Sequence, residues 1–66
     1  MKNKIKFFRA LNNITQEELA KKVGVSRQTI NYIERGKYVP SVLLALKIAR
    51  VFNCQVEEVF ILEEGD

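Results

Sequence analysis

The most constraining feature of this chain is the placement of helix-start and helix-stop residues between positions 15 and 37. Thr15 is followed three residues later by Glu18, the spacing of a capping box, in which each side chain accepts a hydrogen bond from the other residue's backbone amide. A helix is therefore predicted to begin at Gln16. Gly24 can turn at positive φ without steric cost, so it is predicted to end this helix after about two turns.

A second short helix follows almost immediately. Ser26 is a strong N-cap, whose hydroxyl oxygen can accept from an amide two or three residues later. The helix is therefore predicted to start at Arg27, and Gly36 to cap its end. Ile30 and Ile33 are three residues apart and are predicted to face inward. The opposite surface is left with polar or amphipathic side chains, namely Arg27, Gln28, Asn31, Tyr32 and Arg35.

The two helices are predicted to cross steeply. Helices joined by a turn of three or four residues cross at roughly 90 to 120°, and Ala20 supplies the small side chain that close approach requires. Leu19, Ala20 and Val23 form the inward stripe of the first helix, and Val25 fills the turn. Such a helix-turn-helix is a device for reading DNA. An ordinary helical hairpin inside some other α-domain is the alternative.

Four segments of the chain share a pattern with one family. They are TQEELAKKVGVSRQTI (15–30), IERGKYVPS (33–41), ALKIA (45–49) and VEEVF (56–60). The chain resembles the phage-repressor/Cro-like helix-turn-helix family, often called XRE, over nearly its whole length. The resemblance implies a compact, all-α domain of five helices, in which the second and third helices form the DNA-reading unit.

Length and composition are consistent with a single small domain spanning residues 1–66. A chain of 66 residues has no room for a second domain, and 47% apolar content is enough for a modest core. A chain this short buries only about 60% of its unfolded surface, so its stability is marginal and dimerisation would add to it. A partner surface is therefore expected on physical grounds.

The residues that catalysis or metal binding would need are missing. The chain has no His, no paired acids in an evident pocket and no phosphate-binding glycine loop, so it is not expected to be an enzyme. No metal, cofactor or small-molecule ligand is predicted, and Cys54 is interpreted as a small buried apolar residue. No stretch approaches the roughly 18 apolar residues of a membrane span, and no apolar signal core follows the N-terminal lysines. These features predict a cytoplasmic protein without membrane contact.

The charges are distributed unevenly along the chain. Residues 1–53 hold all 11 Lys and Arg against three Glu, a net charge of +8, whereas the last 13 residues hold five acids and no base. A basic body with an acidic tail directed away from DNA is what electrostatic steering toward phosphates requires.

Apolar spacing predicts a first helix before the helix-turn-helix. Ile5, Phe8 and Leu11 have helical spacing and are predicted to pack on the motif, with the helix beginning near Lys4. In residues 2–6, however, lysine alternates with Asn3 and Ile5, so this segment could instead form a short strand. By resemblance, Arg9 of this helix is expected to form an ion pair with Glu34 at the end of the third helix.

Two further helices are predicted after Pro40. Ser41 is expected to cap a fourth helix whose residues 42–52 are apolar nearly all round, which marks it as the central core element. Asn53 is predicted to end that helix in a left-handed conformation, and residues 55–60 to form a short last helix.

Base-reading residues can be assigned on the predicted recognition helix. The N-terminal part of such a helix enters the major groove, which places Arg27 and Gln28 at the base edges. Arginine can bind guanine through two hydrogen bonds, and glutamine can bind adenine in the same way. Asn31 and Tyr32, one turn later, are the next candidates. Two roles are possible for Thr29, namely a contact with DNA or a structural position beside the cap.

Phosphate contacts are expected on both sides of that helix, because the family places them at the start of the second helix and in the loop after the third. Gln16 is the main candidate, since its side-chain amide and the free helical amides both face an anion there. The matching contacts on the other side are Arg35, Lys37 and Tyr38. Thr29 is grouped with the phosphate contacts as well.

An apolar run near the C-terminus is the candidate dimer interface. Ile61 and Leu62 in particular are expected to meet a symmetry mate or to pair as a strand with residues 2–6. The rival interpretation is that the run covers the monomer's own core. Phe7 is either an exposed apolar residue or part of an interface. The run consists of Val59, Phe60, Ile61 and Leu62.

Together these features predict a transcriptional regulator that acts as a repressor. One recognition helix reads too few base pairs to find a site in a genome, so a homodimer is expected to bind double-stranded DNA at an inverted-repeat operator. The alternative is an antitoxin-type regulator that also binds a toxin protein, although the chain has little additional sequence for that purpose.

Overall fold

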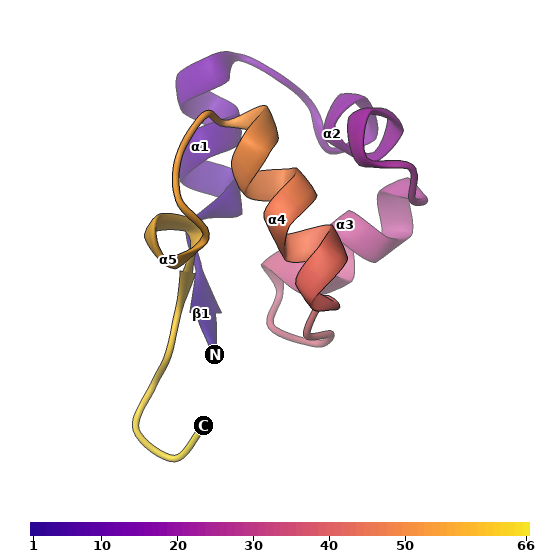
Figure 1. Ribbon diagram of the computed structural model, residues 1–66. Helices are drawn as coiled ribbons and strands as arrows, with labels where there is room; N and C mark the ends of the chain where they lie inside the picture. The colour runs from indigo at the N-terminus through magenta and orange to yellow at the C-terminus, as the bar shows by residue number, and fades with distance from the viewer.

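Five short helices and a pair of two-residue strands make up the fold of this chain (Figure 1). The computed structural model describes all of residues 1–66. The helices lie around one core, and the two ends of the chain lie at the same side of the molecule. The elements, in order, are β1 (Lys2–Asn3), α1 (Ile5–Asn12), α2 (Gln16–Val23), α3 (Arg27–Glu34), α4 (Val42–Val51), α5 (Val56–Val59) and β2 (Phe60–Ile61).

The capping residues of the helix-turn-helix act as the sequence predicts. The backbone amide of Glu18 donates to Thr15 Oγ1 at 3.0 Å, and the amide of Thr15 donates to Glu18 Oε1 at 2.8 Å. Gly24 ends α2 at φ +78°, and Ser26 Oγ accepts from the amide of Thr29 at 3.1 Å. The predicted starts of α2 and α3 are therefore confirmed to the residue.

Asparagine ends two of the other helices. Asn13 after α1 and Asn53 after α4 have φ of 55° and 54°, the left-handed conformation that asparagine tolerates better than most residues. The position of Asn53 confirms the prediction for that helix end. Ser41 caps α4 as predicted, since its hydroxyl accepts from the amide of Leu44 at 3.1 Å.

The core joins all five helices. It contains twelve buried apolar residues, and those predicted to face inward from α2 and α3 are among them. Ala20 is 2% exposed, which agrees with close packing of α2 against its neighbours. The buried set is Ile5, Leu19, Ala20, Val23, Ile30, Ile33, Leu44, Ile48, Ala49, Phe52, Val59 and Phe60.

Helix α1 contributes less to the core than its apolar spacing predicts. Ile5 is fully buried, and the Phe8 ring stacks on Phe52 with 5.4 Å between centroids, but Leu11 is 68% exposed. The prediction for Leu11 is wrong because a repeat of three residues drifts around a helix. Six residues after Ile5, Leu11 is rotated about 120° away from the buried side.

Helix α4 is buried on one side only. Leu44, Ile48 and Ala49 face the core, whereas Val42, Leu43 and Leu46 are 76%, 64% and 52% exposed. The prediction of α4 as the central core element therefore holds for one side of the helix only, although its sequence is apolar nearly all round. A chain of this length has too few elements to cover a second side of α4, which packs chiefly against α2 and α5. Neither α4 nor any other helix has the length and apolarity to span a membrane.

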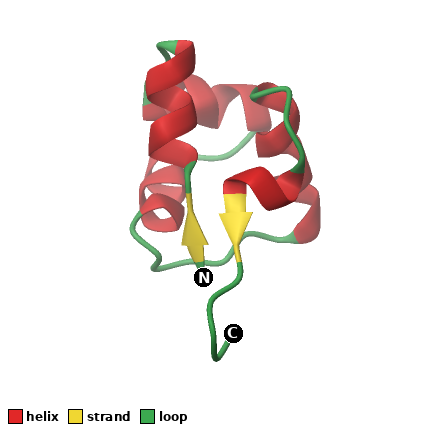
Figure 2. Ribbon diagram, turned by 90° about the vertical axis from the view of Figure 1, so that its left-hand side faces the viewer, coloured by secondary structure: helices red, strands yellow, loops and turns green.

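The two strands join the ends of the chain (Figure 2). They are antiparallel, with Lys2 opposite Ile61 and Asn3 opposite Phe60. Val59 is fully buried and Phe60 is 9% exposed, so both belong to the core of the chain itself. Assigning these two side chains to a dimer interface is therefore wrong, because Val59 at the end of α5 and Phe60 of β2 both pack in the core. Of the predicted apolar run, only Ile61 and Leu62 stay exposed.

Candidate nucleic-acid interface

The outward side of α3 carries the predicted base-reading residues. Arg27 and Gln28 are exposed at the first two positions of the helix, and Tyr32 is 42% exposed one turn later. Asn31 is half-buried. Ile30 and Ile33, on the opposite side of α3, are buried in the core, so the helix is held by its apolar side and presents the polar one.

A hydrogen bond on this surface was not predicted from the sequence. Gln28 Nε2 donates to the hydroxyl of Tyr32 at 2.8 Å, across one turn of α3. The spacing of four residues makes the contact possible, but it could not show that both side chains adopt the required rotamers. The bond fixes the orientation of the Gln28 amide and leaves its carbonyl oxygen and one N–H free.

Thr29 has a structural role at the start of α3. Its hydroxyl lies 2.9 Å from that of Ser26, and its backbone amide donates to the same Ser26 oxygen. The side chain is half-buried. These contacts favour the interpretation of Thr29 as part of the cap, and its contact with phosphate stays a prediction.

An ion pair joins α1 to the end of α3, as the family resemblance implies. Arg9 Nε donates to Glu34 Oε2 at 2.7 Å and Arg9 Nη2 donates to Glu34 Oε1 at 3.1 Å. The two side chains are only 16% and 8% exposed. Hydrogen bonding to Glu34 raises the pKa of Arg9 above its ordinary value, so the guanidinium is fully charged. Arg9 Nη1 also donates to the carbonyl of Ile14, ahead of α2, at 3.2 Å.

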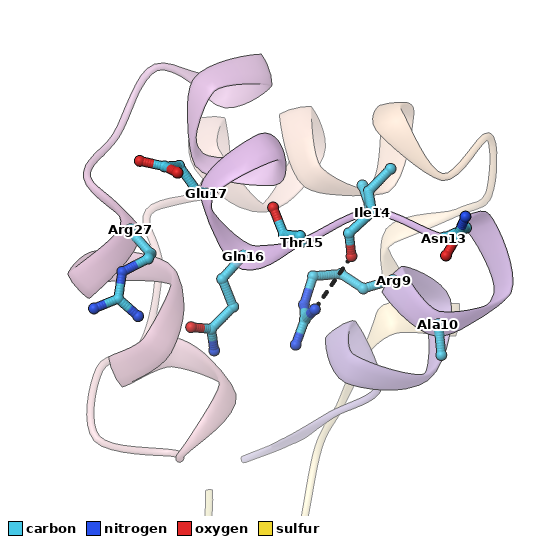
Figure 3. Close-up of a pocket in the computed structure, with 8 residues that line it drawn as sticks. All are labelled: Arg9, Ala10, Asn13, Ile14, Thr15, Gln16, Glu17 and Arg27. Atoms are coloured by element: carbon cyan, nitrogen blue, oxygen red, sulfur yellow. Dashed lines mark hydrogen bonds between the residues drawn. The ribbon is translucent and has the colours of Figure 1, made fainter.

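Gln16 belongs to the same network. Its Nε2 donates to Glu34 Oε1 at 3.2 Å, so Arg9, Glu34 and Gln16 link α1, α3 and the first residue of α2. Figure 3 shows Gln16 and Arg27 on neighbouring helices along the pocket that Arg9 also lines. The predicted phosphate ligand is therefore positioned by the structural ion pair.

A cleft beside this network is lined only by polar residues. Lys6 of α1 is part of it, one turn before Arg9, and Asn3 donates its side-chain amide to the carbonyl of Ile33 at 2.8 Å. Neither residue was singled out from the sequence. The signal for Lys6 was its spacing of three from Arg9, which places both on one side of α1. The lining consists of Asn3, Lys6, Arg9, Gln16, Asn31, Glu34 and Arg35.

The loop after α3 exposes the other predicted phosphate ligands. Gly36 has φ +73°, and the amide of Lys37 donates to the carbonyl of Tyr32 at 2.8 Å, so the chain turns sharply at this point. Arg35, Lys37 and Tyr38 are all exposed. The loop therefore holds two cations and a phenol beside the end of the recognition helix.

Few acidic side chains offset the positive charge of the first 53 residues. Of the three Glu residues there, Glu34 is paired with Arg9 and Glu18 caps α2. Two acids of the C-terminal segment lie near the N-terminus of the chain, where Met1 is within 3.2 Å of Glu63 and 3.1 Å of Asp66. The α2–α3 surface is therefore left with a net positive charge.

Comparison with known proteins identifies the family. Residues 5–59 match the profile of a family described as helix-turn-helix. The chain belongs to the phage-repressor/Cro-like helix-turn-helix family. This family consists of DNA-binding transcriptional regulators and is not a class of enzymes.

Individual relatives agree with that assignment. The chain is 61% identical, over the full length of both proteins, to an uncharacterized HTH-type transcriptional regulator of Methanocaldococcus jannaschii. It is similar to the P22 c2 repressor in complex with a synthetic operator, with a TM-score of 0.79, 30% identity, and coverage of 96% of this chain and 91% of that one. It is also similar to the N-terminal DNA-binding domain of SinR from Bacillus subtilis, with a TM-score of 0.77, 28% identity and the same coverage.

Proposed function

We propose that this regulator is a repressor that binds an inverted-repeat operator as a homodimer, with α3 in the major groove. The observation that carries the proposal is the surface of α3, where Arg27 and Gln28 are exposed at the N-terminal end of a helix whose other side is fixed in the core. A rigid helix with free polar side chains at this end has the arrangement that direct reading of base edges requires.

Each residue of that surface has a proposed role. Arg27 binds a guanine through its O6 and N7 atoms, and Gln28 binds an adenine through N6 and N7. Gln28 reaches the base with the orientation that Tyr32 gives it. Asn31 contacts an adenine or a phosphate, and Tyr32 lies against a thymine methyl group or the sugar–phosphate wall.

The residues at the two sides of α3 hold the DNA backbone. Gln16, at the first position of α2, offers its amide together with the free amides of the helix N-terminus. Arg35, Lys37 and Tyr38 bind the backbone on the opposite side, and the hydroxyl of Thr29 is the remaining candidate. Such contacts set the register of the protein on DNA without reading its sequence.

A homodimer places two recognition helices on one side of the duplex. Half-sites one helical turn apart require the two helices to be about 34 Å apart. Because the two half-sites are read together, the dimer distinguishes its operator from random DNA far better than one helix can. Occupation of the operator then blocks transcription.

The proposed roles can be tested by separating specific from nonspecific binding. An operator is first selected from random DNA by the wild-type protein, and gel-shift affinities for this operator and for a random duplex are then compared. Arg27→Ala combined with Gln28→Ala is expected to remove the preference for the operator, whereas Gln16→Ala is expected to weaken binding to both duplexes by a similar factor. Equal effects of the two variants on both duplexes would refute the assigned roles.

A further inference from the structure

We propose that a second copy of this chain docks on the outer face of α4, defined by Val42, Leu43 and Leu46, and on the groove between α4 and α5. This proposal rests on the homodimer of the proposed function and names the surface that forms it. The three side chains are more than half exposed, and Leu46 follows Val42 and Leu43 by about one helical turn on the same helix. A contiguous apolar surface of this kind, with a polar border, is typical of a protein–protein contact.

The groove next to this face has apolar and charged walls. Leu46 and Ala49 of α4 lie on one side, and Val56 of α5 lies on the other. Helices α4 and α5 pack against each other, so the groove is a fixed part of the fold (Figure 1). Leu43 or Leu46 of a second copy is therefore offered both an apolar face and a recess in which to pack.

The border of the groove carries charges of both signs. Arg50 of α4 lines it on one side and Glu57 of α5 on the other. Neither side chain forms an ion pair within the chain, whose only side-chain ion pair between Lys or Arg and an acid is Arg9 with Glu34. In a two-fold dimer a contact between residues i and j occurs twice. Two copies of this one surface can therefore pair Arg50 with Glu57 at two places.

The other exposed apolar residues lack this complementarity. Leu62 is 78% exposed, but Glu63 and Asp66 after it already pair with the N-terminal ammonium of Met1, so they offer no free charge to a second copy. Ile61 is already paired with Lys2 through the backbone. On α1, Phe7 and Leu11 are exposed in a helix that has basic but no acidic side chains.

The surface is also separate from the residues proposed to contact DNA. A standard interface removes about 800 Å² from each partner, roughly one sixth of the 4747 Å² surface of this chain, so the contact must extend from the α4 face into the groove. The outer face of α4 and the groove share no residue with the base-reading and phosphate-binding sets. A dimer formed here therefore uses none of the proposed DNA contacts.

The first test is the effect of single substitutions on self-association. Sedimentation equilibrium over about 1–200 μM covers the range in which a micromolar dimer dissociates. Leu46→Lys and Leu43→Lys are each expected to raise the dimer dissociation constant by about 30-fold or more. Leu11→Lys and Leu62→Lys are matched controls at exposed apolar positions elsewhere and are expected to leave it unchanged. All four positions are exposed, so circular dichroism is expected to show folded protein in each case.

The second test is a charge exchange across the two-fold axis. Arg50→Glu and Glu57→Lys are each expected to weaken the dimer by about tenfold, because each creates a like-charged pair at both borders. The double variant with both changes restores opposite charges and is expected to recover most of the wild-type affinity. Failure of the double variant to recover would overturn the proposed pairing.

Failure of the α4 surface and failure of the proposed function would give different experimental outcomes. A wild-type chain that is monomeric throughout the range, or a dimer that Leu62→Lys abolishes and Leu46→Lys leaves intact, would overturn the α4 surface. Binding of the Leu46→Lys variant to a duplex with one selected half-site tests the DNA-reading role alone, and this binding is expected to match that of the wild-type chain. Failure to select any DNA sequence would instead count against the proposed function, whatever the sedimentation data show.

Discussion

The helix-turn-helix and the C-terminal half of this chain are stabilised in different ways. Helices in both regions begin at side-chain caps, but in residues 15–37 an ion pair to α1 and the core also fix the helices in place. The exposed surface of that region is polar. Residues 42–62 have a helix with an apolar outer face and a last helix of only four residues. The first region is complete within one chain, whereas the second still exposes apolar surface that a partner can bury.

The largest expected effect tests the polar network of the first region. Arg9→Leu leaves the Glu34 carboxylate, which is 8% exposed, without its cation. We expect this variant to lower the free energy of unfolding by about 3–5 kcal/mol, because an unpaired buried charge is costly. Urea denaturation followed by circular dichroism measures the change. Lys21→Leu, at an exposed position without an ion pair, is the control and is expected to change stability by less than about 0.5 kcal/mol.

The same variant also links stability to DNA binding. Gln16 is held by Glu34, which is itself held by Arg9. Loss of Arg9 is therefore expected to weaken binding to operator and random DNA alike at temperatures where the variant is still folded. An unchanged melting temperature in Arg9→Leu would show that the ion pair adds nothing to the fold.

The second prediction compares the two sides of α4. Ile48 is fully buried and Leu46 is 52% exposed two residues away on the same helix. Ile48→Ala is expected to cost about 2–5 kcal/mol because it leaves a cavity in the core. Leu46→Ala is expected to cost less than about 0.5 kcal/mol at protein concentrations where the chain is monomeric. Similar losses in both variants would contradict the one-sided burial of α4.

Local sequence signals explain why the ends of the helices could be predicted. A cap such as Thr15 or Ser26 acts through its own backbone neighbours, and Gly24 and Asn53 act through their own φ angles, so sequence alone contains the information. The burial of a helix side depends on which other elements reach it. For that reason the exposure of Leu11 could not be read from its spacing.

In the candidate site, too, the features set by local sequence were predictable and those set by contacts between distant residues were not. The positions of Arg27 and Gln28 on α3 follow from the cap at Ser26, so their exposure was predictable. The hydrogen bonds of Gln28 with Tyr32 and of Gln16 with Glu34 depend on rotamers and on the approach of separate helices. Sequence reasoning therefore identified these residues without showing how they are oriented.

The third prediction tests that orientation on the reading surface. Tyr32→Phe removes the hydroxyl that accepts from Gln28 Nε2 and keeps the ring. A hydrogen bond of this kind contributes about 0.5–1.5 kcal/mol, so affinity for the selected operator is expected to fall about 2- to 10-fold. Affinity for random DNA is expected to stay the same. Tyr38→Phe is the matched control, because Tyr38 is proposed to contact phosphate and its loss should affect both duplexes equally.

The smallest expected effect concerns the cap at the start of the first region. Hydrogen bonds from the backbone amide of Thr15 hold the pKa of Glu18 below its ordinary value. A carboxylate whose pKa is lower in the folded state stabilises the fold above its unfolded pKa of about 4.3, and this contribution is lost as pH falls through the folded pKa. Thermal melting of Glu18→Gln is therefore expected to lie below the wild-type curve near pH 7 and to converge with it in acid.

Glu17→Gln is the control for this prediction, because Glu17 is also in the first turn of α2 but makes no capping hydrogen bond. Its melting temperature is expected to follow the wild-type protein across the whole pH range apart from a small helix-dipole effect. A difference between Glu18→Gln and wild type that stays constant from neutral to acidic pH would mean that the charge of Glu18 does not stabilise α2. Glu18 would then act through its hydrogen bond with the Thr15 amide and not through its charge, and the first region would be less dependent on its charged residues than the Arg9–Glu34 pair suggests.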